Sequence, residues 1–176
     1  MKNRKGFTLV EILAMLVILG ILMAVAIPNI SGILNNNRKN AYKSDATRMV
    51  DTAKMKVAKG NVKKPAKNKC VVLALKYLND SDDIVKGPNG GLYLEYESFV
   101  IIKRIDNKYE YYVRLVEDAP GGNYGINMDT IPNINKEDST SIDTVNTVYG
   151  FTGAETAANM SIPGYCAVGD VSYYYK

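Results

Sequence analysis

Histidine and tryptophan are absent from this 176-residue sequence, and cysteine occurs only twice. Without histidine, the chain lacks the usual catalytic base, the Ser-His and Cys-His nucleophile pairs, and the commonest metal ligand. Two cysteines supply too few donors for a four-ligand structural zinc site. These absences argue against an enzyme, and we expect neither a catalytic residue nor a cofactor.

Charge is distributed unevenly along the chain, whose net charge is +4. Residues 38–69 hold 11 Lys and Arg against Asp45 and Asp51, which makes a basic middle of +9. Residues 70–176 hold 8 Lys and Arg against 15 Asp and Glu, which makes an acidic remainder of −7. The basic middle could bind DNA or an anionic cell-wall polymer, but packing against the acidic part of a neighbouring copy accounts for it more simply.

Residues 7–27 form an apolar run whose only charge is Glu11. As a helix, this run would be about 31 Å long, close to the hydrocarbon thickness of a bilayer. A cleaved secretory signal fits less well, because the run is long and no small-x-small cleavage site follows it. Basic residues precede the run (Lys2, Arg4 and Lys5), so we expect a single-pass membrane precursor with a cytoplasmic N-terminus.

The helical pattern continues beyond Pro28 to about Lys59, and Gly60 and Pro65 supply the stop. Apolar or small side chains recur at helical spacing on one face: Ile30, Ile33, Leu34, Asn37, Ala41, Ala46, Met49, Val50, Ala53 and Val57. Pro28 and Gly32 should kink the helix or melt it locally. The sequence therefore predicts one long helix, with a membrane-like half and an amphipathic half under a domain.

The remaining residues predict a β-rich head. Ser98–Ile105 and Lys108–Val116 flank Asp106-Asn107, which is typical of an antiparallel hairpin. Residues 118–135 are rich in Gly, Asn and Pro and are expected to form a loop. We assign Leu92–Tyr96 and Val171–Tyr175 as strands. Val71–Leu78 is either a helix or a strand.

Cys70 and Cys166 both lie in the part predicted to be extracellular, where oxidation is permitted. A bridge between them would close a loop of about 97 residues and stabilise the fold by about 4–5 kcal/mol in the chain-entropy model. Two separate buried thiols remain the alternative, because spacing alone does not establish disulfide geometry.

Alternating oxygen-bearing residues in 79–83 make Asp80, Asp82 and Asp83 a weak candidate for calcium. The glycine and the distal glutamate of an EF-hand loop are missing from this segment. A solvated turn is the simpler interpretation, so no metal site is expected.

The N-terminus reads Lys5-Gly6-Phe7-Thr8-Leu9-Val10-Glu11, a short basic leader followed by an apolar helix with one glutamate at its fifth residue. This arrangement resembles the class III signal sequence of the type IV pilin and pseudopilin family, which also commonly has residues like Gly20 and Pro28 at these positions. The resemblance implies an α+β, pilin-like fold in which a long N-terminal helix packs on a small antiparallel sheet. It divides the chain into a leader (1–6), a membrane and assembly half-helix (7–27), an amphipathic half-helix (28–60) and a head (61–176).

The resemblance also implies roles for individual residues. Prepilin peptidase would cut between Gly6 and Phe7, and Phe7 would then be N-methylated. Glu11 would meet the Phe7 amine of a neighbouring subunit, which removes the cost of a lone carboxylate in the bilayer. A chance polar residue that snorkels to the interface is the alternative for Glu11. The helix between Gly20 and Pro28 would stretch within a filament.

The family function implied is that of a structural subunit in a surface filament for adhesion, twitching motility or biofilm formation. Its partners would be other copies of itself, minor pilins, an inner-membrane assembly platform and an ATPase, with the lipid bilayer before assembly. A pseudopilin of a type II secretion or DNA-uptake system is the near alternative. From another class, the rival is a single-pass anchored binding domain that never polymerises. Family members often pair two cysteines nearer the C-terminus, so Cys70 departs from that pattern.

Overall fold

The computed structural model describes residues 6–79, 84–136, 139–145, 149, 151, 162–167 and 170–175. The chain divides into two compact units, Met1–Arg38 and Lys39–Lys176. Helix α1 (Leu9–Ala58) provides the helix of the first unit and continues into the second.

The first unit consists of the N-terminal part of α1. The helical backbone continues through Pro28 and Gly32, so the local melting expected there is not seen in this chain. Proline removes a single N–H donor and crowds one preceding carbonyl, a local cost that the surrounding helical bonds outweigh. Among the side chains that the structure describes in this unit, the large apolar ones are exposed, including Ile30, Ile33 and Leu34.

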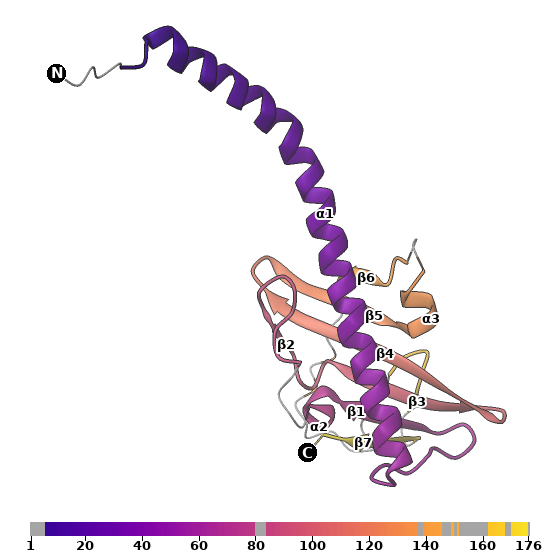
Figure 1. The fold of residues 1–176 in the computed structure, drawn as a ribbon. Helices are drawn as coiled ribbons and strands as arrows, with labels where there is room; N and C mark the ends of the chain where they lie inside the picture. Colours follow the sequence, from indigo (N-terminus) through magenta and orange to yellow (C-terminus); the bar gives the residue numbers. More distant parts are fainter. Residues whose placement is uncertain are drawn as a thin grey trace. The chain divides into compact units, whose positions relative to one another are not determined.

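The second unit is a mixed β-sheet with α1 on one face (Figure 1). Within the described residues, the strand order is β6-β5-β4-β3-β1-β7, and β2 pairs separately with β4. The elements are β1 (Cys70–Ala74), α2 (Leu75–Leu78), β2 (Leu92–Tyr93), β3 (Phe99–Ile105), β4 (Lys108–Ala119), β5 (Gly122–Thr130), α3 (Ile131–Ile134), β6 (Ile142–Thr144) and β7 (Val171–Tyr174).

The predicted fold class is confirmed as α+β with a pilin-like layout, a long N-terminal helix followed by a small sheet. The hairpin around Asp106-Asn107 is also confirmed, because β3 and β4 pair from Ile105↔Lys108 to Phe99↔Arg114. The sheet is mixed, however, and not antiparallel throughout. β7 lies parallel to β1, with Cys70 opposite Val171, so the last strand returns to the far edge of the sheet.

Residues 118–135 are not the loop that their composition predicts. They contain all of β5, which pairs with β4 from Ala119↔Gly122 to Tyr112↔Thr130. The register shifts between Val113↔Asp129 and Leu115↔Ile126, where β5 carries one residue more than β4. Gly125, paired with Val116 just beyond this shift, adopts φ +143°, and a Cβ there would lie 2.0 Å from the Leu115 carbonyl oxygen. The glycine therefore permits close pairing with β4 where composition indicates a loop.

We expect Gly125→Ala to destabilise the head by about 3 kcal/mol or more, because the new methyl group would overlap backbone atoms in a strained conformation. Urea unfolding of the full chain, followed by the circular dichroism of the tyrosines, measures this loss. Gly60→Ala is the matched control. Gly60 also has a positive φ, +81°, but nothing lies within 4 Å of its added Cβ. Equal losses for the two variants would contradict the close approach at Gly125.

The core lies on both faces of the sheet. One face packs against α1, where Ala46, Met49 and Ala53 are fully buried against residues of β1, β3 and β4. The other face carries a second cluster that includes Val72, Phe99 and Ile162. Strand β1 is therefore buried at all five positions, which explains its unbroken apolar run.

Segments near the C-terminus cover the second face, and a buried carboxylate fixes them there. Glu97 accepts hydrogen bonds from the backbone N–H groups of Tyr149 (3.0 Å) and Phe151 (2.9 Å). The guanidinium of Arg114, 3.8 Å from the Glu97 carboxylate, lies over the Tyr149 ring. The two Glu97 hydrogen bonds join segments more than 50 residues apart in the sequence.

A second buried carboxylate, Glu117 on β4, joins the turn before β2 to α1. It accepts backbone hydrogen bonds from Asn89 (3.0 Å) and Gly91 (2.7 Å) and a hydroxyl hydrogen bond from Tyr42 on α1. One turn further along α1, Asp45 accepts a hydrogen bond of 2.8 Å from the Tyr93 hydroxyl. The helix is therefore attached to the head by specific polar contacts as well as by apolar packing.

We expect Asp45→Asn to raise the stability of the head at pH 7 by up to about 1 kcal/mol, and to leave it unchanged near pH 3. Burial raises the pKa of Asp45, although hydrogen bonding from Tyr93 and the charge of Arg48 oppose that rise. The stability that this carboxyl contributes is thus fully present below its unfolded-state pKa and is lost as the pH rises through its folded-state pKa. Asparagine keeps the acceptor for Tyr93 without the charge.

Urea unfolding at the two pH values measures this effect. Asp51→Asn is the control, because it removes an exposed carboxylate from the same helix. A stability gain for Asp45→Asn that is equally large at both pH values would contradict the electrostatic explanation.

Candidate processing and assembly site

The residues that the sequence analysis singles out at the N-terminus lie where α1 begins. Gly6 and Phe7 precede the helix and are exposed, and residues 1–5 of the expected leader lie outside the described residues. Thr8 is the residue before the first helical position, and its carbonyl oxygen accepts the first helical hydrogen bond, from the Ile12 N–H at 3.2 Å. The expected cleavage point is therefore in accessible backbone immediately before the helix.

Glu11 and Thr8 bind one another through three hydrogen bonds. The Glu11 carboxylate accepts from the Thr8 backbone N–H at 2.7 Å and from the Thr8 hydroxyl at 2.9 Å. The Glu11 N–H donates in return to the Thr8 hydroxyl oxygen at 3.3 Å. This reciprocal arrangement is a capping box, which satisfies backbone donors that the first turn of a helix leaves free.

The capping box gives Glu11 a second physical role that the sequence analysis missed. The sequence signal was present, since Thr-x-x-Glu before an apolar run is the known pattern. In a bilayer, hydrogen bonds to Thr8 would partly replace the water that solvates the carboxylate. The two donors carry no full charge, so the carboxylate still lacks a cationic partner among the described residues.

The helix that follows the capping box is apolar and exposed on all sides. Its large apolar side chains from Leu9 to Val25 are 46% to 84% exposed. By length and composition α1 could cross a membrane. Such a surface on a chain in water would be strongly unfavourable, so it requires lipid or other helices around it.

Gly20 lies in the middle of this apolar surface, with nothing within 4 Å of a Cβ added there. Pro28 lies within α1, beyond the apolar run. Their expected roles in helix packing and stretching stay predictions. Asp80, Asp82 and Asp83, the weak calcium candidates, lie outside the described residues.

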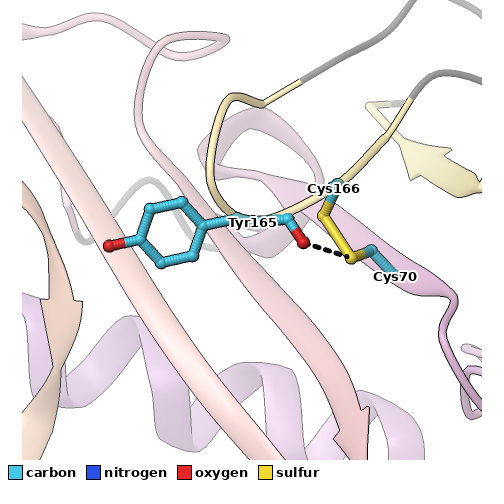
Figure 2. Close-up of a disulfide and its surroundings, with 3 residues drawn as sticks. All are labelled: Cys70, Tyr165 and Cys166. Carbon is cyan, nitrogen blue, oxygen red and sulfur yellow. Dashed lines mark hydrogen bonds between the residues drawn. A yellow bond between two sulfur atoms is a disulfide. The ribbon is translucent and has the colours of Figure 1, made fainter.

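The two cysteines form a disulfide in the head (Figure 2). Cys70 opens β1, and Cys166 lies in the segment that covers the second face of the sheet, with the two Cα atoms 6.0 Å apart. The Tyr165 carbonyl oxygen is 3.4 Å from Cys70 Sγ. The bridge therefore fastens the C-terminal covering segment to β1, which lies between β3 and β7 in the sheet.

Many charges of the basic middle have partners in the head or on α1. Lys69 pairs with Asp170 at 2.9 Å, and Lys54 pairs with Asp51 at 3.0 Å. Three lysine ammonium groups also lie over tyrosine rings: Lys54 over Tyr111, Lys56 over Tyr77 and Lys64 over Tyr109. Part of the basic middle is thus used within the fold, and the expected packing against the acidic part of a neighbouring copy stays a prediction.

The long apolar helix and the small sheet give the chain a pilin-like layout, and the helix fits a membrane-anchored precursor. A family model described as the prokaryotic N-terminal methylation motif matches residues 1–27. This motif is the class III signal of type IV pilins, and it supports a type IV pilin-type or pseudopilin-type protein. Comparison with curated proteins and with solved structures found no match to this chain.

Proposed function

We propose that this chain is a structural subunit of a type IV pilus-like surface filament. Prepilin peptidase removes residues 1–6 by cleavage between Gly6 and Phe7, and Phe7 is N-methylated. Residues 7–27 anchor the precursor in the membrane and then form the filament core. Residues 28–60 and 61–176 provide the amphipathic half-helix and the head outside the cell.

The observation that carries this proposal is the position of Glu11 within the matched motif. It is the only charge in the apolar run and lies four residues after Phe7. A carboxylate at such a position costs several kcal/mol in a bilayer unless it is paired. The neighbour's Phe7 amine, created by cleavage, would supply the missing cation, so assembly would relieve a cost that the free subunit bears.

Charge pairing matters here because hydrophobic transfer contributes little to assembly. Moving an apolar helix from lipid into a helical bundle exchanges one apolar environment for another. Register must then come from close packing and from the Glu11 pair. Gly20 offers a site of close helix approach, since it presents no side chain.

The partners in this proposal are those that the family resemblance implies. Other copies of the chain and related minor pilins form the filament, and an inner-membrane platform with its ATPase drives it. Adhesion, twitching motility and biofilm formation are the surface roles that such a filament would serve. DNA or an anionic cell-wall polymer would be an additional partner of exposed lysines.

Intact mass and N-terminal fragmentation of the protein from filaments sheared off its native cells test the proposal. We expect a chain that starts at Phe7, one methyl group heavier and two hydrogens lighter than its reduced, unmodified sequence. Leader removal would also change the net charge from +4 to +1, because three basic residues leave with it.

A chain that stays in the membrane with residues 1–6 attached, and that is missing from the sheared fraction, would refute the filament. It would favour the single-pass anchored binding domain. Methylated protein that stays in the cell envelope and enters the sheared fraction only on overproduction would favour a secretion or DNA-uptake pseudopilus.

A further inference from the structure

The sequence contains a single Asn-Gly pair, Asn89-Gly90, in the turn that precedes β2. In such a pair the glycine nitrogen can attack the asparagine side-chain carbon Cγ, because glycine has no Cβ to obstruct the approach. The new N–Cγ bond forms and the Cγ–Nδ2 bond breaks, so a succinimide ring replaces the amide and ammonia leaves. Water then opens the ring at one of its two carbonyls and produces aspartate or isoaspartate. The pair is therefore a candidate site of covalent modification.

The conformation of the turn requires a glycine after Asn89. Gly90 adopts φ +87°, in the left-handed region that favours glycine. Its N–H donates to the Gly87 carbonyl oxygen at 3.1 Å, and the Gly87 N–H donates to the Gly91 carbonyl oxygen at 3.0 Å. The reactive pair is thus a consequence of the turn, and the fold has to restrain it.

Helix α1 and strand β4 hold Asn89 in place. Its Nδ2 donates to the Tyr42 hydroxyl oxygen at 2.7 Å, and its backbone N–H donates to the Glu117 carboxylate at 3.0 Å. The Tyr42 hydroxyl donates its own proton to Glu117. Tyr42 is 3% exposed and Glu117 is 0% exposed, so water competes little for these hydrogen bonds. All three residues belong to the same compact unit, Lys39–Lys176.

These hydrogen bonds engage the atoms that would have to react. The Gly90 nitrogen must lose the proton that it shares with the Gly87 carbonyl oxygen. The movement of Asn89 Cγ towards that nitrogen also draws Nδ2 away from Tyr42. Ring closure therefore requires local opening of the turn, and a group that reacts only after opening reacts in proportion to the population of the open state.

We propose that Asn89-Gly90 is a deamidation site that Tyr42 keeps closed while α1 contacts the turn, and that opens when this contact is lost. The product does not restore the contact. A carboxylate at position 89 has no hydrogen to donate to Tyr42, and it adds a second negative charge beside buried Glu117. Isoaspartate also lengthens the backbone by one methylene group, which displaces the N–H groups that bind Glu117. Each deamidation event therefore leaves the turn less firmly attached to α1.

The test follows deamidation in the full chain, kept in detergent micelles and mildly alkaline buffer. Peptide mapping by mass spectrometry separates asparagine, aspartate and isoaspartate at position 89 over time. The chain unfolded in guanidinium chloride with a reductant should deamidate there at least about tenfold faster than the folded chain, since unfolding removes the protection. Tyr42→Phe keeps the ring and removes the hydroxyl, so it should raise the rate in the folded chain about fivefold through the loss of one hydrogen bond.

Tyr93→Phe is the matched control for Tyr42→Phe. It removes the hydroxyl of another tyrosine between α1 and the head, which donates to Asp45 and not to Asn89. We expect it to change the deamidation rate less than about twofold, because its effect on the turn is indirect. Equal acceleration by the two variants would overturn the specific role of Tyr42, and so would an unchanged rate in Tyr42→Phe. Equal rates in the folded and unfolded chains would overturn the protection itself.

A second measurement tests the effect of the product. Asn89→Asp should lower the denaturant midpoint of the head, because it removes the donor to Tyr42 and places a charge beside Glu117. Asn40→Asp makes the same change at an exposed position of α1 and should leave the midpoint unchanged. An unchanged midpoint for Asn89→Asp would contradict the loss of contact. These outcomes concern the head alone and do not rest on polymerisation, so they can fail while the filament proposal stands, and the reverse.

Discussion

Glu11→Ala is expected to lower the amount of this protein in sheared filaments at least about tenfold, while the protein remains in the membrane. Under the proposed function, the Glu11 carboxylate pairs with the Phe7 amine of the next subunit. Without the carboxylate, assembly no longer relieves the cost of a lone charge in the bilayer, and the subunit loses the contact that sets its register in the filament. The Phe7 amine of the neighbouring subunit is also left unpaired. The ratio of sheared to membrane-bound protein, measured by immunoblot in native cells, gives the result.

Two variants separate the possible causes of this loss. Thr8→Val removes the hydroxyl of the capping box and keeps the Glu11 charge, so a small effect is expected if the intersubunit pair dominates. Asp143→Ala removes an exposed carboxylate from β6 in the head and should leave filament content unchanged. A normal filament content for Glu11→Ala would refute the pairing role and favour a carboxylate that merely reaches the interface.

Removing the disulfide is expected to lower the free energy of unfolding of the head by about 4–5 kcal/mol. Cys70 and Cys166 are 96 positions apart, so their bridge restricts a large part of the unfolded chain. The double variant Cys70→Ala/Cys166→Ala should show this loss in urea, followed by the near-ultraviolet circular dichroism of the tyrosines. A reductant should produce a similar loss in the wild type and none in the variant.

The head should still fold without the bridge, because two other contacts hold the covering segment. Strand β7 pairs with β1 over four residue pairs, and Glu97 binds the backbone of Tyr149 and Phe151. Glu97→Gln in the double variant should therefore add a further loss. A loss below about 1 kcal/mol for the double variant would contradict the entropic role of the bridge and indicate an unfolded state that is already compact.

The candidate assembly site could be predicted from sequence because its information is local. Glu11 is four positions from Phe7, and Thr8 is three positions from Glu11, so helix geometry alone brings them together. The capping box was recognisable by the same rule. The contacts of Glu97 with the backbone of Tyr149 and Phe151 could not be found in this way, because these partners lie 52 and 54 positions away in the sequence.

The sequence by itself determined the long apolar helix, the capping box at its start, the buried face from Ala46 to Val57 and the β3–β4 hairpin. Each of these follows from periodicity or turn chemistry within a short stretch of chain. Only the tertiary structure decided that a Gly-rich segment forms β5, that β7 lies parallel to β1, and that Glu97 and Glu117 are buried. The β1–β7 pairing and the contacts of Glu97 and Glu117 depend on partners 26 to 101 positions away. The β5 pairing with β4 is closer, at 3 to 18 positions, but it runs against the loop-forming composition of the segment. Local sequence preferences do not specify such pairings.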